Sequence, residues 1–282
     1  MADESLQEIV CCMGQPVAGN PSQFMMERSF AAAGLDWRYL TLEVAPEDLA
    51  AAVAGMKAMG FRGGNFTIPH KVAVIPYLTR LTEAAELMGA VNCIYAEEDG
   101  FVGENTDGKG FVSALKEVID PAEKKIVLLG AGGAARAIAV ELGLNKAASI
   151  EVVNRDASRG RALAELLSER VGIESKWTPW NGTHGLAEDT DIVINGTSIG
   201  LCDGSAMVPV DPSTFRESMV VADVIFNPPQ TLFLQAAEEA GCQTIDGLGM
   251  LVNQGVIGFK IWTGVDPDPT VMREALEEYL GI

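Results

Sequence analysis

The sequence predicts an α/β protein with two domains, each built from strands that alternate with helices. Its 282 residues suffice for one large or two modest domains at about 150 residues each. Apolar runs of strand length recur between segments with helical spacing, an order typical of a sheet flanked by helices. A second series of this kind begins at Lys125, where residues 126–129 form one continuous apolar run. Such a run is expected for a strand buried on both faces.

The first series predicts an N-terminal α/β region. Its segments are assigned from apolar periodicity and from glycine or proline at their ends. The expected strands are residues 8–13 and 39–44, together with a strand within residues 63–69 that runs into a loop. The expected helices are residues 21–33, 46–59 and 72–87. Residues 90–95 and 101–103 predict a hairpin that turns at residues 97–100.

The second series predicts a sheet of buried strands followed by a helical tail. The expected strands are residues 126–129, 149–153, 191–195, 220–224 and 244–245. The expected helices are residues 134–142, 158–168, 231–240, 250–262 and 269–280. Together the two series give two α/β domains.

Charge and cysteine content exclude several classes of function. The chain has 39 Asp+Glu against 20 Lys+Arg, a net charge of −19, which repels nucleic-acid phosphates and anionic membranes. The N-terminus lacks the basic region of a signal peptide, and no apolar stretch is long enough to span a membrane. Five cysteines without a CxxC pair, and only two histidines, indicate reduced thiols and no metal site. We therefore expect a cytoplasmic protein with a small-molecule ligand.

A glycine-rich loop follows the first strand of the second series. Residues 130–135 match the dinucleotide fingerprint G-x-G-x-x-G/A, with Ala135 as the third small residue. The glycines permit a tight turn and close approach of a pyrophosphate, which the free N–H groups of the following helix would bind. The order strand, loop, helix and next strand predicts a Rossmann-type, doubly wound nucleotide-binding domain.

The end of the next strand bears on the identity of the cofactor. NAD-binding proteins usually place an acidic residue there for the ribose 2′-hydroxyl. This chain has Asn154 and Arg155, followed by Asp156 and Arg159. Because a guanidinium can stack on adenine and pair with a 2′-phosphate, the residues favour NADP. Asp156 keeps NAD as an alternative.

Three further segments carry polar residues that a fold alone does not require: residues 65–71, 89–92 and 103–108. With the glycine loop, they resemble the shikimate dehydrogenase family and its quinate/shikimate relatives. The family pattern N-x-T-x-P-x-K is met by Asn65, Thr67, Pro69 and Lys71. The patterns G-A-V-N and N-T-D-G are met at residues 89–92 and 105–108. Further matches, in the same order as in the family, are Asn154-Arg155, residues 195–198, residues 246–251 and Gln254.

The resemblance implies a substrate-binding catalytic domain at residues 1–108, completed by C-terminal helices at residues 247–282. It implies an NADP-binding Rossmann domain at residues 109–246, with a catalytic cleft between the two. The implied reaction is the reversible reduction of 3-dehydroshikimate to shikimate, a step of the chorismate pathway to aromatic amino acids. Lys71 and Asp107 would be the acid–base pair, since a lysine beside a carboxylate can protonate a developing alkoxide.

The resemblance also assigns binding residues. The implied substrate-binding residues are Ser22, Asn20, Thr67, Asn92 and Gln254. The implied cofactor-binding residues are Gly130, Ala131, Gly132, Gly133, Ala134, Asn154, Arg155, Arg159, Thr197, Ser198, Gly247 and Met250. Hydroxyl and amide groups suit a substrate with several hydroxyls and a carboxylate. Monomers and homodimers are both consistent with the resemblance.

The chain departs from the family pattern at two places. In the family, a histidine is followed by S-x-S. Here Gly19 occupies the position of the histidine and Asn20 that of the first serine, and only the second serine is retained, as Ser22. The position of the family's substrate-contacting tyrosine is occupied by Phe226. These changes leave open a quinate/shikimate dehydrogenase that uses NAD or NADP on a related hydroxylated cyclohexane carboxylate. A non-catalytic relative is disfavoured because both Lys71 and Asp107 are present.

Overall fold

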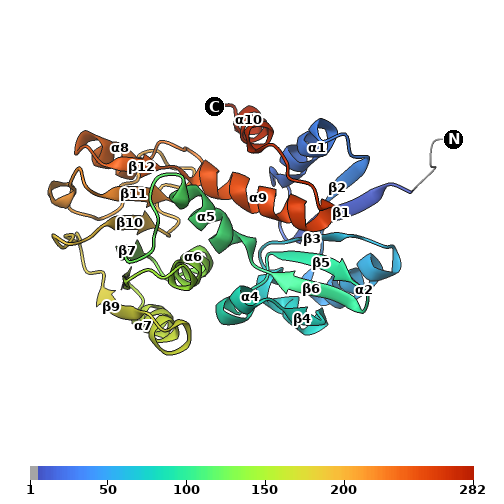
Figure 1. The fold of residues 1–282 in the computed structure, drawn as a ribbon, viewed down its shortest axis with the longest axis horizontal. Coiled ribbons are helices and arrows are strands. Elements are labelled where there is room, and N and C mark those ends of the chain that lie inside the picture. Colours follow the sequence, from blue (N-terminus) through green and yellow to red (C-terminus); the bar gives the residue numbers. More distant parts are fainter. Residues whose placement is uncertain (1–5) are drawn as a thin grey trace. The chain divides into compact units, whose positions relative to one another are not determined.

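The computed structural model describes residues 6–282, and the chain divides into two compact units (Figure 1). The first unit comprises Met1–Thr106 and Gly255–Ile282, and the second Asp107–Gln254. The chain returns to the first unit along one helix, α9 (Gly247–Thr263). The boundary expected at residue 247 coincides with the start of α9, whereas the contacts divide the helix after Gln254.

The first unit is built on a six-stranded mixed sheet with the strand order β2-β1-β3-β5-β6-β4. β1 pairs in parallel with β2 and β3, and β5 is antiparallel to both β3 and β6. The strands are β1 (Glu8–Gly14), β2 (Trp37–Glu43), β3 (Gly63–Phe66), β4 (Arg80–Leu81), β5 (Cys93–Glu97) and β6 (Gly100–Glu104). The predicted hairpin is confirmed as β5–β6.

The helices of the first unit come from both ends of the chain. They are α1 (Ser22–Ala32), α2 (Leu49–Ala58), α3 (His70–Ala73), α4 (Glu83–Met88), the second half of α9, and α10 (Pro269–Leu280), with short 3-10 turns at Pro46–Asp48 and Ile75–Tyr77. α10 packs against α1: the rings of Phe24 and Tyr279 lie 5.8 Å apart, and Arg28 forms an ion pair with Glu278. These contacts explain why the C-terminal segment belongs to this unit.

The single helix expected at residues 72–87 is wrong. The segment contains α3, a 3-10 turn, the two-residue strand β4 and α4. Pro76 lacks the N–H that a continuous helix needs, and Leu78 adopts an extended conformation. β4 then pairs with β6, and the hydroxyl of Thr82 accepts from the N–H of Ala85 to start α4.

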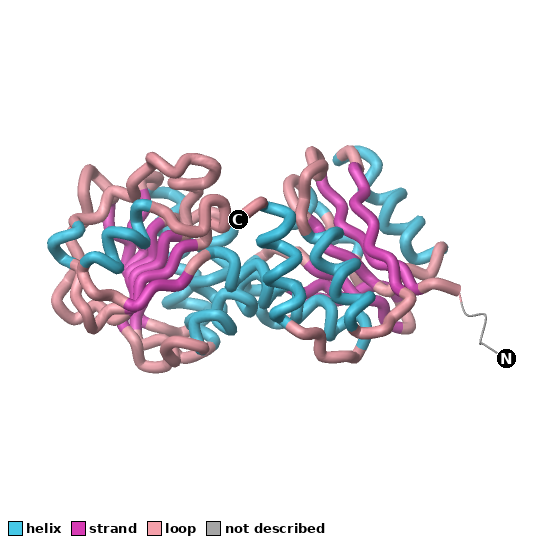
Figure 2. The backbone as a smooth tube through the Cα atoms, turned by 90° about the horizontal axis from the view of Figure 1, so that it is seen from above, coloured by secondary structure: helices cyan, strands magenta, loops and turns pink. Residues whose placement is uncertain are grey.

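The second unit has a fully parallel six-stranded sheet with the order β12-β11-β10-β7-β8-β9. Figure 2 shows its strands (magenta) as a twisted stack with helices (cyan) on both sides. The strands are β7 (Lys125–Leu129), β8 (Ser149–Asn154), β9 (Glu174–Pro179), β10 (Ile192–Asn195), β11 (Val220–Asp223) and β12 (Gln243–Ile245). This order is the Rossmann order, with its reversal between β7 and β10. The predicted α/β class with a Rossmann-type domain is confirmed.

The helices of the second unit include one that the sequence did not predict. They are α5 (Thr106–Lys116), α6 (Gly133–Leu144), α7 (Ala157–Leu166), a π-helical turn at Leu167–Val171, a 3-10 turn at Pro212–Thr214, α8 (Leu232–Glu239) and the first half of α9. α5 begins inside the polar segment at residues 103–108, where the sequence did not predict a helix. Its glycines weaken helix propensity but allow close packing. A Cβ at Gly108 would lie 2.4 Å from the carbonyl oxygen of Ala137, and one at Gly110 would lie 2.6 Å from the backbone nitrogen of Gln254.

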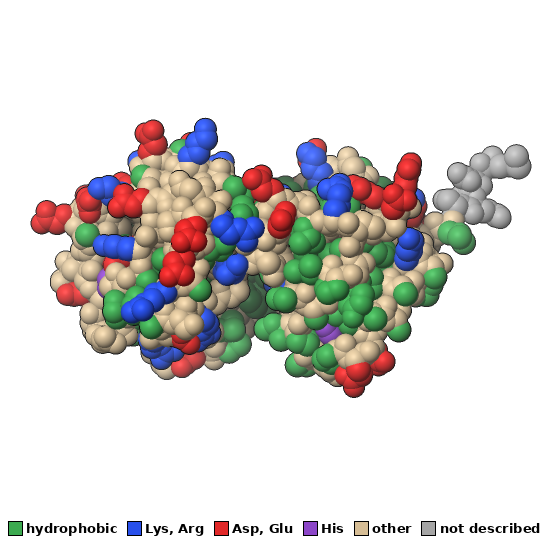
Figure 3. All heavy atoms as spheres, turned by 90° about the horizontal axis from the view of Figure 1, so that it is seen from below, with side chains coloured by type: hydrophobic (Ala, Val, Ile, Leu, Met, Phe, Trp, Pro, Cys, Tyr) green, Lys and Arg blue, Asp and Glu red, His purple; other side chains and the backbone are tan. Residues whose placement is uncertain are grey.

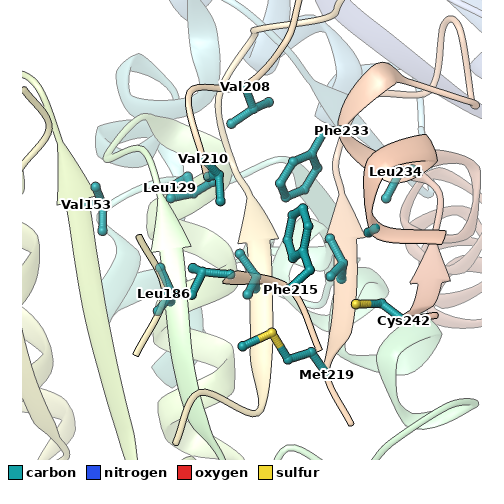
Figure 4. Packing of buried hydrophobic residues seen from close by; sticks show 14 of the residues in the cluster. Leu129, Val153, Leu186, Val208, Val210, Phe215, Met219, Phe233, Leu234 and Cys242 are labelled. Atoms are coloured by element: carbon teal, nitrogen blue, oxygen red, sulfur yellow. The ribbon is translucent and has the colours of Figure 1, made fainter. Parts of the chain in front are cut away.

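A buried hydrophobic cluster fixes the central strands of this sheet (Figure 4). Leu129, Val153 and Val221 are fully buried and come from β7, β8 and β11. Phe215 and Phe233 pack edge to face beside them, with ring centroids 5.9 Å apart. The burial of these side chains stabilises the strands. The carboxyl ends of the strands carry the polar residues described below.

The surface carries the charge expected from composition. On the face drawn in Figure 3, acidic (red) and basic (blue) side chains are interspersed. Within residues 6–282, no helix combines the length and apolar character needed to cross a bilayer.

Candidate active site

The glycine-rich turn of the second unit lies between β7, which ends at Leu129, and α6, which begins at Gly133. Gly130 has φ +105°, and a Cβ there would lie 2.9 Å from Cγ2 of Thr197. Only glycine fits this conformation and spacing. The turn therefore passes close to the loop that follows β10.

Gly132 and Gly133 have a different environment. A Cβ added at either residue would meet no protein atom within 4 Å, and both residues are exposed. The protein's own packing therefore does not require glycine at these two positions. The first N–H groups of α6 have no partner within the helix and attract anions at its N-terminus. The turn fits a dinucleotide pyrophosphate.

One hollow of the second unit gathers the predicted cofactor residues. Its lining comprises Gly130, Ala131, Gly132, Gly133, Ala134, Asn154, Arg155, Arg159, Trp180, Gly196, Thr197, Ser198, Ile199, Leu201, Val224, Ile225 and Phe226. All predicted cofactor-binding residues are present except Gly247 and Met250. Gly247 instead packs tightly against the backbone of Ile225, where an added Cβ would lie 2.4 Å from the carbonyl.

Sequence reasoning did not identify several lining residues, including Trp180, Ile199 and Val224. Trp180 is buried, and its indole N–H donates to the carbonyl of Pro209 at 3.0 Å. These residues lie outside the glycine motif, so only the strand order places them beside it. Ile199 follows the predicted strand at residues 191–195 and Val224 ends the one at residues 220–224, whereas Trp180 follows β9, which the sequence did not predict.

The carboxylate of Asp156 is engaged within its own helix. It accepts from the backbone N–H of Arg159 at 3.0 Å as the N-cap of α7, and it pairs with the guanidinium of Arg159 at 3.2 Å. These bonds hold the pKa of Asp156 below its ordinary value. Asn154 donates to the backbone carbonyl of Asp156 at 2.8 Å. The exposed Arg155 guanidinium thus lines the hollow beside a capped helix.

At the ends of β10 and β11, Asn195 and Asp223 form a buried hydrogen-bonded pair. Asp223 is 1% exposed, and burial raises its pKa to about 6. Thr197, which lines the hollow, bonds to the amide oxygen of Asn195 through both its N–H and its hydroxyl.

The predicted substrate residues of the first unit meet at one edge of its sheet. β1 and β3 run parallel, and β5 runs antiparallel to β3, so the ends of the first two strands share an edge with the start of β5. Thr67 follows β3, and its backbone N–H donates to the carbonyl of Met13 at 2.9 Å. Asn92 directly precedes β5, and its carbonyl accepts from the N–H of Phe66 at 2.9 Å.

A chain of buried hydrogen bonds underlies this edge. The hydroxyl of Tyr39 donates to Oδ1 of Asn65 at 2.6 Å, and Nδ2 of Asn65 donates to the carbonyl of Asn92 at 3.0 Å. Oδ1 of Asn92 accepts from the N–H of Thr106 at 2.7 Å, and its Nδ2 donates to the Thr106 hydroxyl at 3.0 Å. Burial raises the pKa of Tyr39 far above its ordinary value, while a hydrogen bond with Ser22 opposes that shift. The edge is therefore rigidly supported.

Asn20 and Ser22 lie together after β1. Oδ1 of Asn20 accepts from the backbone N–H of Ser22 at 2.9 Å, and Nδ2 of Asn20 donates to Sγ of Cys12 at 3.6 Å. Burial raises the pKa of the Cys12 thiol to about 11, so this sulfur is a neutral acceptor at pH 7. Both ends of the Asn20 amide are thus bound inside the first unit.

Lys71 lies on α3, half-buried, with its carbonyl accepting from the N–H of Val91 at 2.7 Å. The neighbouring His70 is fully buried, and its Nε2 lies 2.8 Å from the carbonyl of Val44. Asp107 lies in the first turn of α5, in the second unit, and is half-buried. Gln254 is buried on α9 and donates to the carbonyl of Leu251.

Metal ligation finds no support in the described part of the chain. Among residues 6–282, no group of three or more His, Cys, Asp or Glu side chains could hold a metal ion.

A Rossmann unit whose hollow is lined by the glycine turn and two arginines, in a chain whose other α/β unit carries a half-buried lysine, is typical of a nucleotide-dependent oxidoreductase. Three family models match the chain. They are the shikimate dehydrogenase substrate binding domain at residues 12–94, shikimate / quinate 5-dehydrogenase at residues 113–224, and the shikimate 5'-dehydrogenase C-terminal domain at residues 247–277.

Whole-chain comparisons agree with these matches. A shikimate dehydrogenase (NADP(+)) of Moorella thermoacetica is 42% identical over 97% of this chain and 94% of its own length. The chain belongs to the shikimate dehydrogenase family.

Solved structures similar to this chain are named for different substrates. A 5-ketofructose reductase of Gluconobacter sp. strain CHM43 is 49% identical with a TM-score of 0.95, covering 97% of this chain and 99% of that one. A shikimate dehydrogenase in complex with NADP+ is 37% identical, with a TM-score of 0.89 and coverage of 97% and 96%. A quinate dehydrogenase of Corynebacterium glutamicum in complex with NAD is 30% identical, with a TM-score of 0.89 and coverage of 96% and 99%.

Proposed function

We propose that this protein catalyses the NADP-dependent, reversible reduction of 3-dehydroshikimate to shikimate, a step toward chorismate and the aromatic amino acids. The carrying observation is the hollow of the second unit, where the glycine turn and the two arginines after β8 line one space. The names of the curated relatives support the substrate and the cofactor. The proposed domains are residues 1–108 with 247–282 for substrate and residues 109–246 for NADP.

Different residues of the chain bind the cofactor and transfer the proton. The N–H groups at the start of α6 hold the pyrophosphate, and Arg155 and Arg159 bind the 2′-phosphate. Bound NADPH supplies the hydride. Lys71 donates a proton to the ketone oxygen and stabilises its developing negative charge, and Asp107 is the second member of this acid–base pair.

The substrate's hydroxyls and carboxylate are held by a separate group of side chains. Their hydroxyl and amide groups can donate to and accept from a polyhydroxylated ring. The proposed substrate-binding residues are Ser22, Asn20, Thr67, Asn92 and Gln254. On the cofactor side, Gly247 and Met250 complete the proposed set around the nicotinamide.

Lys71→Ala tests the assignment of the proton donor. We expect kcat to fall at least about 100-fold, since a positioned general acid contributes 10²–10⁴-fold, while NADP+ affinity stays within about twofold. Lys57→Ala is the matched control, because Lys57 is an exposed lysine of the same unit and donates to the carbonyl of Asp99. Near-normal turnover of Lys71→Ala would remove Lys71 from the mechanism.

Reduction of 5-ketofructose is a second candidate function. It is favoured by the 49% identity with the Gluconobacter reductase and by Asn20, whose amide is bound to Ser22 and Cys12 where the family pattern has a serine. A neutral polyhydroxy ketone has no carboxylate and does not need that serine. Quinate remains a third substrate to test, in view of the related dehydrogenase.

Initial rates separate these candidates. Shikimate, quinate and fructose are oxidised, and 3-dehydroshikimate and 5-ketofructose are reduced, each with NADP(H) and NAD(H). We expect the highest kcat/KM for the shikimate pair with NADP(H). A higher value for the fructose pair would replace the first candidate with the second, and a preference for NAD(H) would overturn the role of Arg155 and Arg159.

We also propose a cytoplasmic location and a monomer or homodimer. The five cysteines are all free thiols, and four of them are buried, which suits a reducing compartment. Light scattering of the purified protein measures the oligomeric state.

A further inference from the structure

Asp223 is a buried carboxylate beside the cofactor hollow, and the proposed reaction assigns this residue no role. It ends β11 and is 1% exposed. The next residues along the chain, Val224, Ile225 and Phe226, line the hollow. A carboxylate is costly to bury, so its contacts matter.

Three segments donate hydrogen bonds to this one side chain. Oδ1 accepts from Nδ2 of Asn195 at 2.9 Å and from the backbone N–H of Ile225 at 3.0 Å. Oδ2 accepts from the hydroxyl of Thr231, the N-cap of α8, at 2.8 Å. The carboxylate therefore joins the end of β10, the loop after β11 and the start of α8.

Asn195 extends this connection to the other loop of the hollow. Its Nδ2 also donates to the carbonyl of Ile199 at 3.3 Å, and its Oδ1 accepts from the N–H and the hydroxyl of Thr197. The Thr197 hydroxyl in turn accepts from the N–H of Ile199 at 3.1 Å. The loop after β10 is thus folded around the Asn195 amide, which Asp223 holds in place.

The sheet order indicates which half of the cofactor these loops face. A dinucleotide lies across the strand-order reversal, here between β7 and β10. Arg155 and Arg159 follow β8, on one side of β7, and mark the adenosine half. The loops held by Asp223 follow β10 and β11 on the opposite side and so face the nicotinamide half.

We propose that Asp223 is a positioning residue for the nicotinamide half of the cofactor, acting through Asn195 and Ile225 on the two loops that line it. The inference rests on the NADP-dependent function proposed above. Asp223 should therefore affect the orientation of the nicotinamide and not the binding of the 2′-phosphoadenosine half.

The test compares two ligands that differ only in the nicotinamide: NADP+ and 2′-phospho-ADP-ribose. In Asp223→Ala we expect the affinity for NADP+ to fall about tenfold, the order expected when buried hydrogen bonds are lost. The affinity for 2′-phospho-ADP-ribose should stay within about twofold. In Asp223→Asn the remaining oxygen can still accept from Asn195 and Ile225, so NADP+ affinity should recover to within about threefold of the wild type. If Asp223→Ala does not fold, Asp223→Ser is measured with the same expected pattern.

Asp211→Ala is the matched control, because Asp211 is a partly exposed carboxylate that caps the 3-10 turn at Pro212–Thr214 by accepting from the N–H of Ser213. Neither affinity should change in it by more than about twofold. Equal losses for both ligands in Asp223→Ala, or no loss for either, would overturn the inference alone. A wild-type protein that does not bind NADP+ would overturn the proposed function and this inference with it.

Discussion

At the scale of single residues, Asn20 is the clearest departure from the family pattern. Its amide oxygen accepts from the N–H of Ser22, the first residue of α1, and its amide nitrogen donates to the thiol of Cys12. A serine there could also accept from the Ser22 N–H, and its shorter side chain would leave room and a hydroxyl donor for a carboxylate. Asn20 therefore bears directly on the choice between a cyclic acid and a neutral sugar.

Asn20→Ser should shift the substrate preference toward shikimate. We expect the ratio of kcat/KM for shikimate to that for fructose to rise about tenfold, since a hydrogen bond to a charged group contributes about 1.5–3 kcal/mol. Steady-state rates with both substrates measure it. Asn20→Ala removes the amide without adding a hydroxyl and should not raise the ratio; an equal rise in both variants would contradict the carboxylate explanation.

Asp223 predicts an unusual pH dependence of stability. Burial raises its folded pKa from 3.8 to about 6, so the folded state holds the proton more tightly than the unfolded chain does. Stability from this group is therefore fully present below about pH 4 and is lost as the pH rises to about 6. The loss is up to about 3 kcal/mol at 1.36 kcal/mol per pKa unit.

Urea unfolding of the wild type and Asp223→Asn at several pH values isolates that contribution. Asparagine does not titrate, and all other groups are shared. The stability of the wild type relative to the variant should therefore fall between pH 4 and pH 7. A relative stability that rises over this range would mean that hydrogen bonds, and not burial, set the pKa.

At the scale of elements, α6 separates two uses of glycine. At Gly132, before the helix, an added Cβ would meet no protein atom within 4 Å. At Gly143, near its other end, an added Cβ would lie 2.5 Å from Cγ1 of Val171. The first glycine leaves space for a ligand, and the second leaves space for the protein itself.

The two alanine variants should therefore have opposite effects. Gly132→Ala should keep or slightly raise the free energy of unfolding, by up to about 1 kcal/mol, while weakening NADP+ binding at least tenfold, roughly the 1.4 kcal/mol that a tenfold loss represents. Gly143→Ala should lose about 1–3 kcal/mol of stability through overpacking and bind NADP+ normally. Calorimetry and urea unfolding check both, and normal NADP+ binding by Gly132→Ala would exclude the glycine turn as the pyrophosphate site.

Elements with a clear period were predictable from sequence, and those set by tertiary contacts were not. The apolar run at β7 and the hairpin β5–β6 were predicted because neighbouring residues determine them. α5 was missed because Gly108 and Gly110 lower helix propensity, and their purpose appears only when α6 and α9 lie against them. β9 was missed because this edge strand alternates weakly between polar and apolar residues.

The candidate site likewise contains residues that a local motif predicts and residues that only tertiary contacts bring together. The glycine turn, Arg155 and Thr197 could be predicted because each belongs to a local motif, and one hollow gathers them. The link between Asn195 and Asp223 joins residues 28 positions apart and depends on the pairing of β10 with β11. The burial of His70 could not be predicted from its neighbours, because it depends on a contact with the carbonyl of Val44, 26 positions away.

At the scale of the whole molecule, a net charge of −19 opposes the capture of anionic ligands. The groups that hold them act over a few ångströms: the N–H groups of α6, and the guanidinium groups of Arg155 and Arg159. Salt screens exposed charges beyond about 10 Å at 0.1 M and beyond about 30 Å at 0.01 M. Added salt should therefore weaken the distant repulsion more than the local attraction.

The KM for NADPH should accordingly fall, by about twofold, when salt is raised from about 0.01 M to about 0.1 M at constant pH. The KM for 3-dehydroshikimate, an anion, should fall in the same direction and by less, because it carries fewer charges. The KM for 5-ketofructose, a neutral ketone, is the internal control and should not change if the protein turns it over. A steep rise in the KM for NADPH would show that Arg155 and Arg159 outweigh the net field, and Arg155→Ala should then abolish that rise.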